Sequence, residues 1–332
     1  MSTVECTPAQ TEFLKSEISD FSPEKWKVEL AGRAGSSRYF LRLSFMNRSF
    51  VLVVWDGRDE DWPRFLRIQN DLCSIVPFLP RIYSTDVVRG LILEEDLGST
   101  TLKSFCQKNA DDRNRIMEKY RSVLDALFVW QSIKIDASPV IAARSMDLET
   151  FLWESWYFAH YCVTDYFAAE RLLNSSWEKE RSMLAEEAAA LPKVCIHRDF
   201  QSENVMLHNG KIRFVDYQGA RLGPAGYDVA SLLFDPYVEM LNQPEATELY
   251  KYYNGLHNDG FEQRSFYICA AQRLMQALGA YGNLSIHKGK EWYRDYIPVA
   301  IERLWFVLNN LPEFPAIAQV VSVCRDSLKS MN

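Results

Sequence analysis

The sequence lacks the features that mark several special classes of protein. Its seven cysteines are scattered and odd in number, and no C-x-x-C pair occurs, which argues against a disulfide framework and a cysteine-based zinc site. No apolar run reaches the roughly 18 residues of a membrane span, and the first residues have neither the basic nor the apolar part of a secretion signal. We therefore expect a cytoplasmic protein with no membrane partner.

An excess of positive charge is also missing. The formal net charge is −7, and the lysines and arginines do not cluster as they do in proteins that bind a phosphate backbone. Nucleic acid is therefore not expected as a partner, and small molecules are expected instead. The 332 residues are 48% hydrophobic and 13% aromatic, which is enough for a globular protein with two lobes or domains.

The densest set of His, Asp and Asn residues surrounds a predicted hairpin. Residues 205–208 and 211–216 are two short β-prone runs, and Asn209-Gly210 separates them. Both turn residues tolerate a positive φ angle, so this pair is a strong two-residue hairpin signal. The sequence therefore predicts two antiparallel strands here.

The register of this hairpin brings two oxygen-bearing side chains together. Counting outward from the turn pairs Asn204 with Val215, so that Asn204 and Asp216 lie side by side at the open end. Opposed residues in such a pair are about 5 Å apart. An amide oxygen and a carboxylate, with Asp199 a few residues earlier, are suitable ligands for a hard cation such as Mg²⁺. Each residue taken singly is more often a turn residue that bonds its own backbone.

The motif His197-Arg198-Asp199, followed by Asn204 and Asp216, resembles the catalytic loop and metal-binding aspartate of kinase-fold phosphotransferases. The resemblance implies that Asp199 is the catalytic base and that Asn204 and Asp216 hold Mg²⁺. It makes His197 a scaffold residue of the loop rather than a proton carrier.

The residues after Asp216 narrow the resemblance. They read Tyr217-Gln218 where protein kinases have Phe-Gly, which favours the aminoglycoside phosphotransferase/choline kinase superfamily. Within it, HRDFQSENVML and FVDYQGARLGPAGYDVASLLFDPY are most similar to the bacterial anomeric kinases of N-acetylmuramate and N-acetylglucosamine, which serve cell-wall recycling. The resemblance implies ATP or another nucleoside triphosphate and Mg²⁺ as cofactors, with a sugar or amino-alcohol as acceptor.

The resemblance also implies an architecture. We expect an α+β, two-lobed protein-kinase-like fold with a small antiparallel-sheet N-lobe and a larger, mainly helical C-lobe. Residues 1–96 would form the nucleotide-binding lobe, and residues 97–332 the catalytic and substrate-binding lobe. Alternating apolar residues predict strands over 39–45 and 49–55, and residues 7–20 predict a short amphipathic helix that leans on this lobe.

A loop that contains Ser36 and Ser37 precedes the first of these strands. In the resembled fold, the backbone amides of this loop cover the nucleotide phosphates. A short glycine- and serine-containing loop is by itself weak support, because most such loops are only turns.

Lysine is absent from residues 28 to 102, although kinase-fold enzymes usually hold the phosphates with a strand lysine. Arg38 and Arg42 point to one face of their predicted strand by the period of two, and guanidinium groups bind phosphate bidentately. These arginines either replace the lysine or form a solvated charged face. Glu60 stands just before a helix that we expect Asp61 to cap. Glu60 either pairs with one of these two arginines or interacts favourably with the helix dipole.

The run Glu94-Glu95-Asp96-Leu97-Gly98 closes another apolar strand and is similar to the hinge of the resembled family. The resemblance implies that backbone groups of Glu95, Asp96 and Leu97 meet the adenine.

Helical periodicity then predicts a long helix over 113–131, an aromatic-rich helix over 148–166 and a helix over 263–279. Trp156 is the best candidate for a sugar-stacking residue, although an aromatic helix is more often core, and His160 is expected to be structural.

Three charged residues complete the candidate site. Arg221 lies close in sequence to Asp216, so it can bind substrate or developing phosphate charge, or simply fix a loop by an ion pair. Arg273, in a run that also looks like the family, is a further substrate-binding candidate. Asp228 is expected to cap the following helix and, by the resemblance, to hold the catalytic loop.

Two other functions stay open at this point. An aminoglycoside, choline or another amino-alcohol is the rival acceptor, and the net charge cannot discriminate, because sites for cations need carboxylates or aromatic faces. A non-catalytic pseudokinase that binds nucleotide is the rival from another class, suggested by the missing strand lysine.

Overall fold

A computed structural model describes residues 4–31, 38–55, 59–257 and 260–331 of the chain, which divides into two compact units. The first unit comprises Met1–Thr101 and Met206–Gln218, and the second comprises Leu102–Val205 and Gly219–Asn332. The chain thus returns to the first unit for the predicted hairpin. The lobe boundary at residues 96 and 97 stays a prediction.

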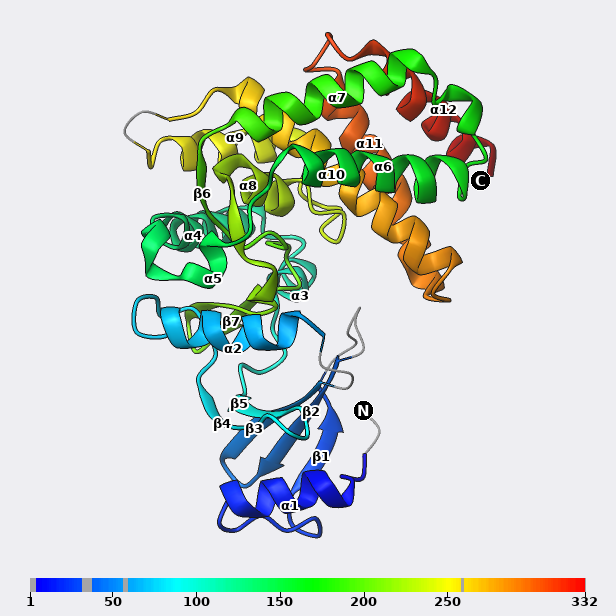
Figure 1. Cartoon of the computed structure of the whole chain (residues 1–332). Coiled ribbons are helices and arrows are strands. Elements are labelled where there is room, and N and C mark those ends of the chain that lie inside the picture. The colour runs from blue at the N-terminus through cyan, green and yellow to red at the C-terminus, as the bar shows by residue number, and fades with distance from the viewer. Residues whose placement is uncertain (1–3, 32–37, 56–58, 258–259, 332) are drawn as a thin grey trace. The chain divides into compact units, whose positions relative to one another are not determined.

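The first unit is built on a five-stranded antiparallel sheet with the strand order β1-β2-β3-β5-β4 (Figure 1). The strands predicted from period-two alternation are confirmed as β2 and β3. The elements of this unit are α1 (Pro8–Glu17), β1 (Lys27–Leu30), β2 (Arg38–Phe45), β3 (Arg48–Trp55), α2 (Asp61–Leu72), β4 (Ile82–Asp86), β5 (Leu91–Glu95), β7 (Val205–His208) and β8 (Lys211–Phe214).

The two faces of this sheet carry different side chains. Leu41 and Leu43 of β2 are buried on one face, where Phe13 of α1 joins the same apolar cluster. This packing confirms the short helix predicted against the first lobe. Because side chains alternate along a strand, Arg38 and Arg42 lie on the opposite face.

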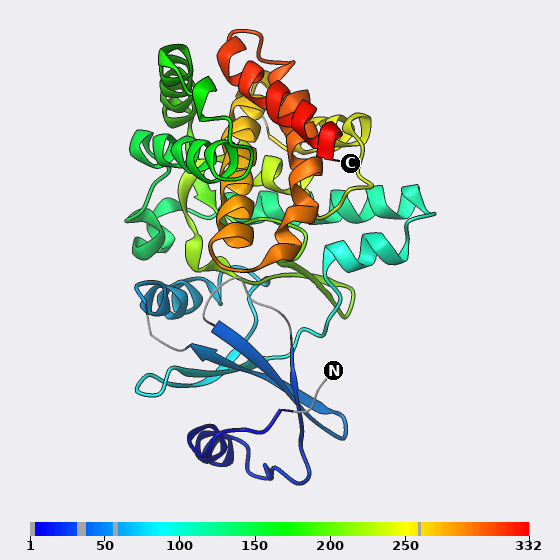
Figure 2. The same cartoon turned by 90° about the vertical axis from the view of Figure 1, so that its right-hand side faces the viewer.

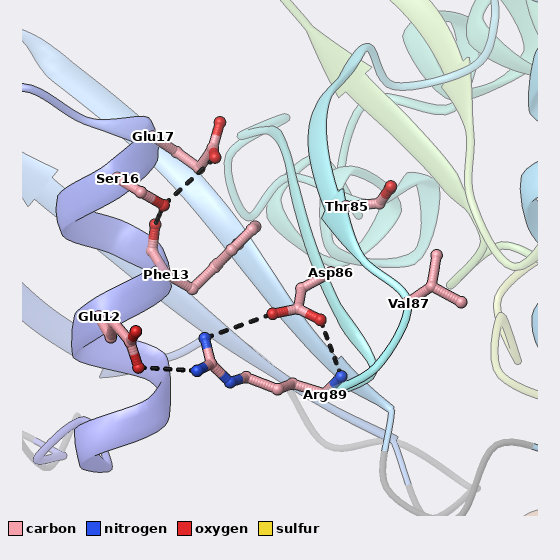
Figure 3. A pocket seen from close by; sticks show the side chains of 8 residues that line it. All are labelled: Glu12, Phe13, Ser16, Glu17, Thr85, Asp86, Val87 and Arg89. Carbon is pink, nitrogen blue, oxygen red and sulfur yellow. Dashed lines mark hydrogen bonds and ion pairs between the residues drawn. The ribbon is translucent and has the colours of Figure 1, made fainter.

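A pocket of about 330 Å³ lies between α1 and the turn after β4 (Figure 3). The Arg89 guanidinium pairs there with Glu12 at 2.7 Å and with Asp86 at 3.4 Å. Ion pairs on the surface stabilise a fold by only about 0–1 kcal/mol each. Because α1 covers the face opposite Arg38 and Arg42, this pocket is not a candidate for nucleotide phosphates.

The hairpin predicted from Asn209-Gly210 is confirmed as β7 and β8, and these residues have φ angles of 49° and 75°. The predicted second strand is too long, because β8 ends at Phe214 and Asp216 has a left-handed φ of 64°. A positive φ at a non-glycine residue ends regular pairing and is often found at functional turns. The expected placement of Asn204 beside Asp216 stays a prediction.

Helix α2 shows a one-residue error in the predicted cap. Its N-cap is Glu60, and Asp61 is the first helical residue. The reason is Asp59, whose Oδ1 accepts hydrogen bonds from the Asp61 N–H at 3.1 Å and from Trp55 Nε1 at 3.2 Å. An upstream carboxylate thus takes over the capping that was assigned to Asp61.

The second unit is mainly helical. Helix α4 coincides with the helix predicted over 113–131, and α10 packs against α6, α8 and α11 (Figure 2). None of the described helices combines the length and apolar character that crossing a bilayer requires. The elements are α3 (Leu102–Lys108), α4 (Arg113–Gln131), η1 (Ile135–Ala137), α5 (Pro139–Ala142), α6 (Leu148–Tyr157), η2 (Phe158–Thr164), η3 (Glu170–Leu172), α7 (Ser175–Ala190), β6 (Lys193–Ile196), η4 (Tyr217–Gly219, which straddles both units), β9 (Arg221–Pro224), α8 (Ala225–Leu233), α9 (Gln243–Asn254), α10 (Gln263–Ile286), η5 (Glu291–Tyr296), α11 (Ile297–Leu308) and α12 (Pro315–Met331).

The aromatic segment predicted as one helix over 148–166 is instead α6 followed by the π-helical turn η2. Helix α10 runs unusually close to this junction. A Cβ at Gly279 would lie 2.7 Å from the Tyr157 backbone, and a Cβ at Gly282 would lie 2.3 Å from the Tyr161 carbonyl oxygen. Only glycine permits this approach. A π-turn of this kind is frequently found at functional sites.

Candidate active site

The catalytic loop that follows β6 is held by a buried carboxylate from α8. Asp228 accepts hydrogen bonds from the backbone N–H of His197 at 2.7 Å and of Arg198 at 2.9 Å, and Gln131 Nε2 adds a third at 3.3 Å. Burial raises the pKa of Asp228 to about 7, although these hydrogen bonds oppose the rise. The predicted N-cap role is wrong, because Pro224 holds the cap and Asp228 lies within the helix.

Two further residues stabilise the loop from inside. His197 is fully buried, with its ring 5.8 Å from Trp130 and 5.6 Å from Phe200. This apolar surrounding suits a scaffold residue, the role predicted for it. Asn204 Nδ2 donates to the Asp199 carbonyl oxygen at 2.9 Å, so the amide oxygen is the atom with which Asn204 can ligate a cation.

Asp199 is paired with its sequence neighbour. Arg198, which has a left-handed φ of 78°, donates through Nη1 to both carboxylate oxygens at 2.9 and 2.8 Å. Burial by itself would raise the pKa of Asp199, but Arg198 and Arg273 hold it below its ordinary value. A Cβ at Gly219 would meet Asp199 Oδ2 at 3.5 Å.

Two more guanidinium groups act on Asp199. Arg221 Nε donates to the Gly219 carbonyl oxygen at 2.9 Å, and no described residue accepts a hydrogen bond from its terminal nitrogens. Arg273 donates to two neutral side-chain oxygens at 3.0 and 2.8 Å. Burial and the neighbouring Arg198 charge lower the pKa of Arg221. Both predicted substrate-binding arginines are therefore desolvated cations near Asp199.

Glu154 of α6 is a site carboxyl that sequence reasoning missed. It is fully buried; Oε1 accepts from the Tyr227 hydroxyl at 2.6 Å, whereas Oε2 has no hydrogen-bond partner among the described residues. Burial raises the pKa of Glu154 to about 7, and the three guanidiniums oppose the rise. A glutamate within an otherwise apolar helical face was the available signal. Asp199 and Asp228 are two further carboxyls that contact Arg198.

The aromatic side chains of α6 and η2 form an exposed surface beside this loop. The Trp156 ring stacks on His160 at 5.1 Å, and Trp153 stacks on Tyr157 at 4.7 Å. Trp156 is 44% exposed and Trp153 is 46% exposed, so neither is core. Burial raises the pKa of Tyr157 while the Arg198 charge opposes the rise, which places Tyr157 near the loop.

In the first unit, Arg38 is paired with Asp216, far away in sequence. The Arg38 Nη2 to Asp216 Oδ1 distance is 2.7 Å, and the guanidinium lies over the Trp55 ring at 4.4 Å. Gln218 Nε2 donates to the same carboxylate oxygen at 2.9 Å. The carboxylate predicted to hold a metal thus contacts an arginine predicted to hold phosphate.

Arg42 contacts the hinge stretch instead. Its Nε donates to Asp96 Oδ2 at 2.9 Å and its Nη2 to the Gly98 carbonyl oxygen at 2.6 Å. The two arginines predicted to bind phosphate therefore contact different segments of the same unit.

The hinge has a second anchor that the sequence did not reveal. Arg213 of β8 donates to both oxygens of Glu95, at 3.0 and 2.6 Å. Burial favours the neutral form, but these hydrogen bonds lower the pKa of Glu95. Leu97 is buried. Glu94, which precedes Glu95, is also buried, and this burial raises the pKa of its carboxyl to about 8. Glu94 Oε2 has no hydrogen-bond partner among the described residues.

Some predicted site residues remain to be placed. Ser36 and Ser37 lie outside the described residues. Glu60 stands at the N-cap of α2 without a side-chain capping bond, and its predicted partner stays a prediction.

A protein-family model described as "Phosphotransferase enzyme family" matches residues 19–267. The chain belongs to this family. It is 24% identical to the N-acetylmuramate/N-acetylglucosamine kinase of Pseudomonas putida over 328 residues, which cover 94% of each chain. It is 26% identical to the kinase of that name from Pseudomonas aeruginosa over 304 residues, which cover 88% of this chain and 87% of the relative. The predicted family and the prediction of a small-molecule kinase are confirmed.

Solved structures of the same fold include a choline kinase from Streptococcus pneumoniae, at 14% identity and a TM-score of 0.60, covering 89% of this chain and 96% of that one. An ADP-bound aminoglycoside phosphotransferase, APH(2'')-Ib, matches at 14% identity and a TM-score of 0.59, covering 87% and 95% of the two chains. These likenesses confirm the predicted α+β kinase-like fold class.

Proposed function

We propose that this phosphotransferase moves the γ-phosphoryl group of ATP to the anomeric hydroxyl of a free amino-sugar, N-acetylmuramate or N-acetylglucosamine, in cell-wall recycling. The carrying observation is that Arg221 and Arg273, two buried guanidiniums near Asp199, have no carboxylate as a hydrogen-bond acceptor among the described residues. Such groups disfavour choline and aminoglycosides, which are cations, and suit a neutral or anionic sugar. Relatives named for these two sugars support the choice.

The proposed chemistry needs little from the protein beyond position and charge. The acceptor oxygen forms a bond to the γ-phosphorus while the bond to the bridging oxygen breaks, so that ADP leaves. Asp199 orients the hydroxyl and accepts its proton. The low pKa of Asp199 makes it a weak base. An anomeric hydroxyl is more acidic than an ordinary alcohol, and it therefore matches such a base.

The residues present fit a hard divalent cation. Asn204 offers an amide oxygen, and Asp216 offers a half-exposed carboxylate in a left-handed turn. Oxygen donors of this kind, completed by phosphate oxygens, are what Mg²⁺ takes in phosphoryl-transfer enzymes. When bound, Mg²⁺ neutralises phosphate charge.

We assign residues 1–96 to a nucleotide-binding lobe and residues 97–332 to a catalytic lobe. The residues proposed to contact the nucleotide are Ser36, Ser37, Arg38, Arg42, Glu60, Glu95, Asp96 and Leu97.

The acceptor is proposed to bind between charged and aromatic groups of the second unit. Arg221 and Arg273 supply charge, and Trp156 supplies an exposed ring of the kind on which sugar faces stack. The proposed location is the cytoplasm, where ATP is found.

The test is turnover with ATP or GTP and Mg²⁺ on both amino-sugars, an aminoglycoside and choline. We expect phosphate on the anomeric oxygen of the sugars, identified by phosphorus NMR. The methyl glycoside of N-acetylglucosamine is the matched control, because it lacks only the free anomeric hydroxyl and should not react. Turnover of the methyl glycoside would contradict the anomeric assignment, and turnover of the cations alone would contradict the acceptor class. Nucleotide binding without any transfer would identify a pseudokinase.

A further inference from the structure

In the second unit, a lysine beside the catalytic loop contacts two members of a group of four tyrosines. Lys103 Nζ lies 5.0 Å from the centre of the Tyr237 ring and 5.3 Å from that of the Tyr296 ring. The same nitrogen donates to the Tyr296 hydroxyl at 3.1 Å and to Glu203 Oε1 at 2.8 Å. The ammonium is therefore held by the Tyr237 ring, the Tyr296 hydroxyl and a carboxylate together. We call Tyr237, Tyr281, Tyr293 and Tyr296 the tyrosine box.

The rings of the box support each other. Tyr237 and Tyr296 meet edge to face with ring centres 4.5 Å apart, and Tyr281 and Tyr293 stack at 5.7 Å. The Tyr281 ring centre lies 6.0 Å from that of Tyr237 and 5.9 Å from that of Tyr296. Rings packed on one another in this way keep their faces in place when the group between them is changed.

The box is joined directly to the catalytic loop. Glu203, which pairs with Lys103, precedes Asn204 in that loop. Asp235 accepts from the Ser202 N–H at 2.7 Å and from the Tyr237 N–H at 3.0 Å, which ties the loop to the box. Asp235 therefore connects the box to the loop that carries the proposed base.

Aromatic faces with a nearby carboxylate are what proteins use to bind ammonium ligands, quaternary ammonium above all. Here the side chain of Lys103 takes that place, and its charge is already matched by Glu203. We infer that Lys103 is a specificity-determining residue: it fills the tyrosine box and so denies ammonium-bearing alcohols a binding place beside the loop. The inference rests on the proposed function, because it concerns which acceptors that site admits.

The direct test replaces Lys103 and measures binding rather than turnover. Tetramethylammonium chloride is titrated by calorimetry, at constant ionic strength, into the full chain and into Lys103→Ala. We expect no saturable binding to the unchanged chain. Lys103→Ala keeps Glu203 and the tyrosine rings, so we expect saturable binding that is at least on the order of tenfold tighter than the weakest binding the titration detects.

Two controls separate the box from general effects of charge. Lys119→Ala removes another lysine that lies near a single ring, Phe105, at 5.7 Å, and should gain nothing. Adding Tyr237→Leu to Lys103→Ala should abolish the gain, because it removes a ring face. Should Lys103→Ala fail to fold, Lys103→Gln replaces it with the same expected direction.

A folded Lys103→Ala chain, judged by circular dichroism, that binds the probe no better than the unchanged chain overturns the inference. Retention of the gain after Tyr237→Leu overturns it as well. Neither readout needs an amino-sugar, so a failure of the proposed function would appear separately, as absence of sugar turnover in the unchanged chain.

Discussion

Arg38 and Arg42 of the first unit and Arg221 and Arg273 of the second unit have different hydrogen-bond acceptors. In the first unit, Arg38 is paired with Asp216 and Arg42 with Asp96, so each guanidinium has its own carboxylate. In the second unit, Arg221 has only a backbone oxygen as hydrogen-bond acceptor among the described residues. Arg273 likewise donates only to neutral oxygens.

This difference separates two kinds of anion binding. An anion that approaches Arg38 must compete with a carboxylate, so binding there is coupled to the loss of an ion pair. The cations of the second unit already carry the energetic penalty of burial without a full counter-charge, so an anionic or strongly polar ligand relieves it. The predictions below test this contrast from the largest expected effect to the smallest.

Removing the proposed base should have the largest effect. We expect Asp199→Asn to lower kcat by roughly 10²–10⁴-fold, because the carboxylate acts on the hydroxyl proton in the transition state. Nucleotide affinity should stay within a few-fold of the unchanged chain. Steady-state kinetics and calorimetry measure the two quantities. Near-native turnover would remove Asp199 from the mechanism, and Asp165→Asn, at an exposed hydrogen bond with His287, is the control.

Asp216→Ala tests the matched pair of the first unit. It removes the proposed metal ligand and leaves Arg38 without its carboxylate. We expect Mg²⁺-dependent nucleotide binding to weaken by about tenfold or more, the typical loss for a hydrogen bond or ligand contact to a charged group. Calorimetric titration with and without Mg²⁺ measures it. Equal affinities in variant and unchanged chain, at each Mg²⁺ concentration, would exclude Asp216 as a ligand.

Arg221→Gln tests the unmatched charge of the second unit. The acceptor KM should rise by about tenfold while the nucleotide KM changes little, because this guanidinium is proposed to face the sugar. Arg221→Lys should restore part of the loss, since it keeps the charge but not the planar fork. A rise confined to the nucleotide KM would assign Arg221 to the phosphates instead.

Arg38→Ala and Arg42→Ala test whether this arginine face replaces the missing lysine. We expect each to raise the nucleotide KM or lower turnover, Arg38→Ala by roughly tenfold and Arg42→Ala by less, because Arg42 acts on the hinge at Asp96. A lysine placed at Val53 should not be needed for activity. If both variants keep wild-type kinetics, the phosphate-binding cation lies in the second unit.

Glu94→Gln should change stability rather than rate. Burial keeps the Glu94 carboxyl neutral in the folded state up to a pKa of about 8, whereas the unfolded chain ionises it near pH 4.5. Between these two pH values the folded state binds more protons than the unfolded chain does. The free energy of unfolding therefore falls as pH rises through this range, by at most about 1.4 kcal/mol per pH unit.

The neutral variant removes this contribution. Urea unfolding at pH 5 and pH 8 should show that Glu94→Gln gains stability relative to the unchanged chain as pH rises. A constant difference between the two chains would contradict the buried, neutral carboxyl.

Local patterns predicted the elements that short-range physics determines. The hairpin followed from Asn209-Gly210, and β2 and β3 followed from alternation, because turn geometry and strand periodicity need only neighbouring residues. The catalytic motif was readable because its spacing is short.

Pairings between distant segments could not be predicted. Nothing near Arg38 in the sequence indicates Asp216, and nothing near Lys103 indicates Tyr237 or Tyr296. Glu154 was missed for the same reason, since a buried carboxyl is recognised only when its neighbours in space are known. The π-turn after α6 was also missed, because it depends on the approach of α10.

That approach has a consequence for how the acceptor range of this enzyme can change. Helix α10 carries Arg273, and the segment it touches carries Trp156, so the spacing of the two is fixed where Gly279 and Gly282 meet the backbone of Tyr157 and Tyr161. A methyl group at either glycine would clash with the backbone of the opposite segment. Because backbone atoms cannot move aside as a flexible side chain can, the two segments would have to move apart. If the acceptor binds between Arg273 and Trp156 as proposed, these two glycines govern the width of its site, and engineering toward larger sugars should begin there.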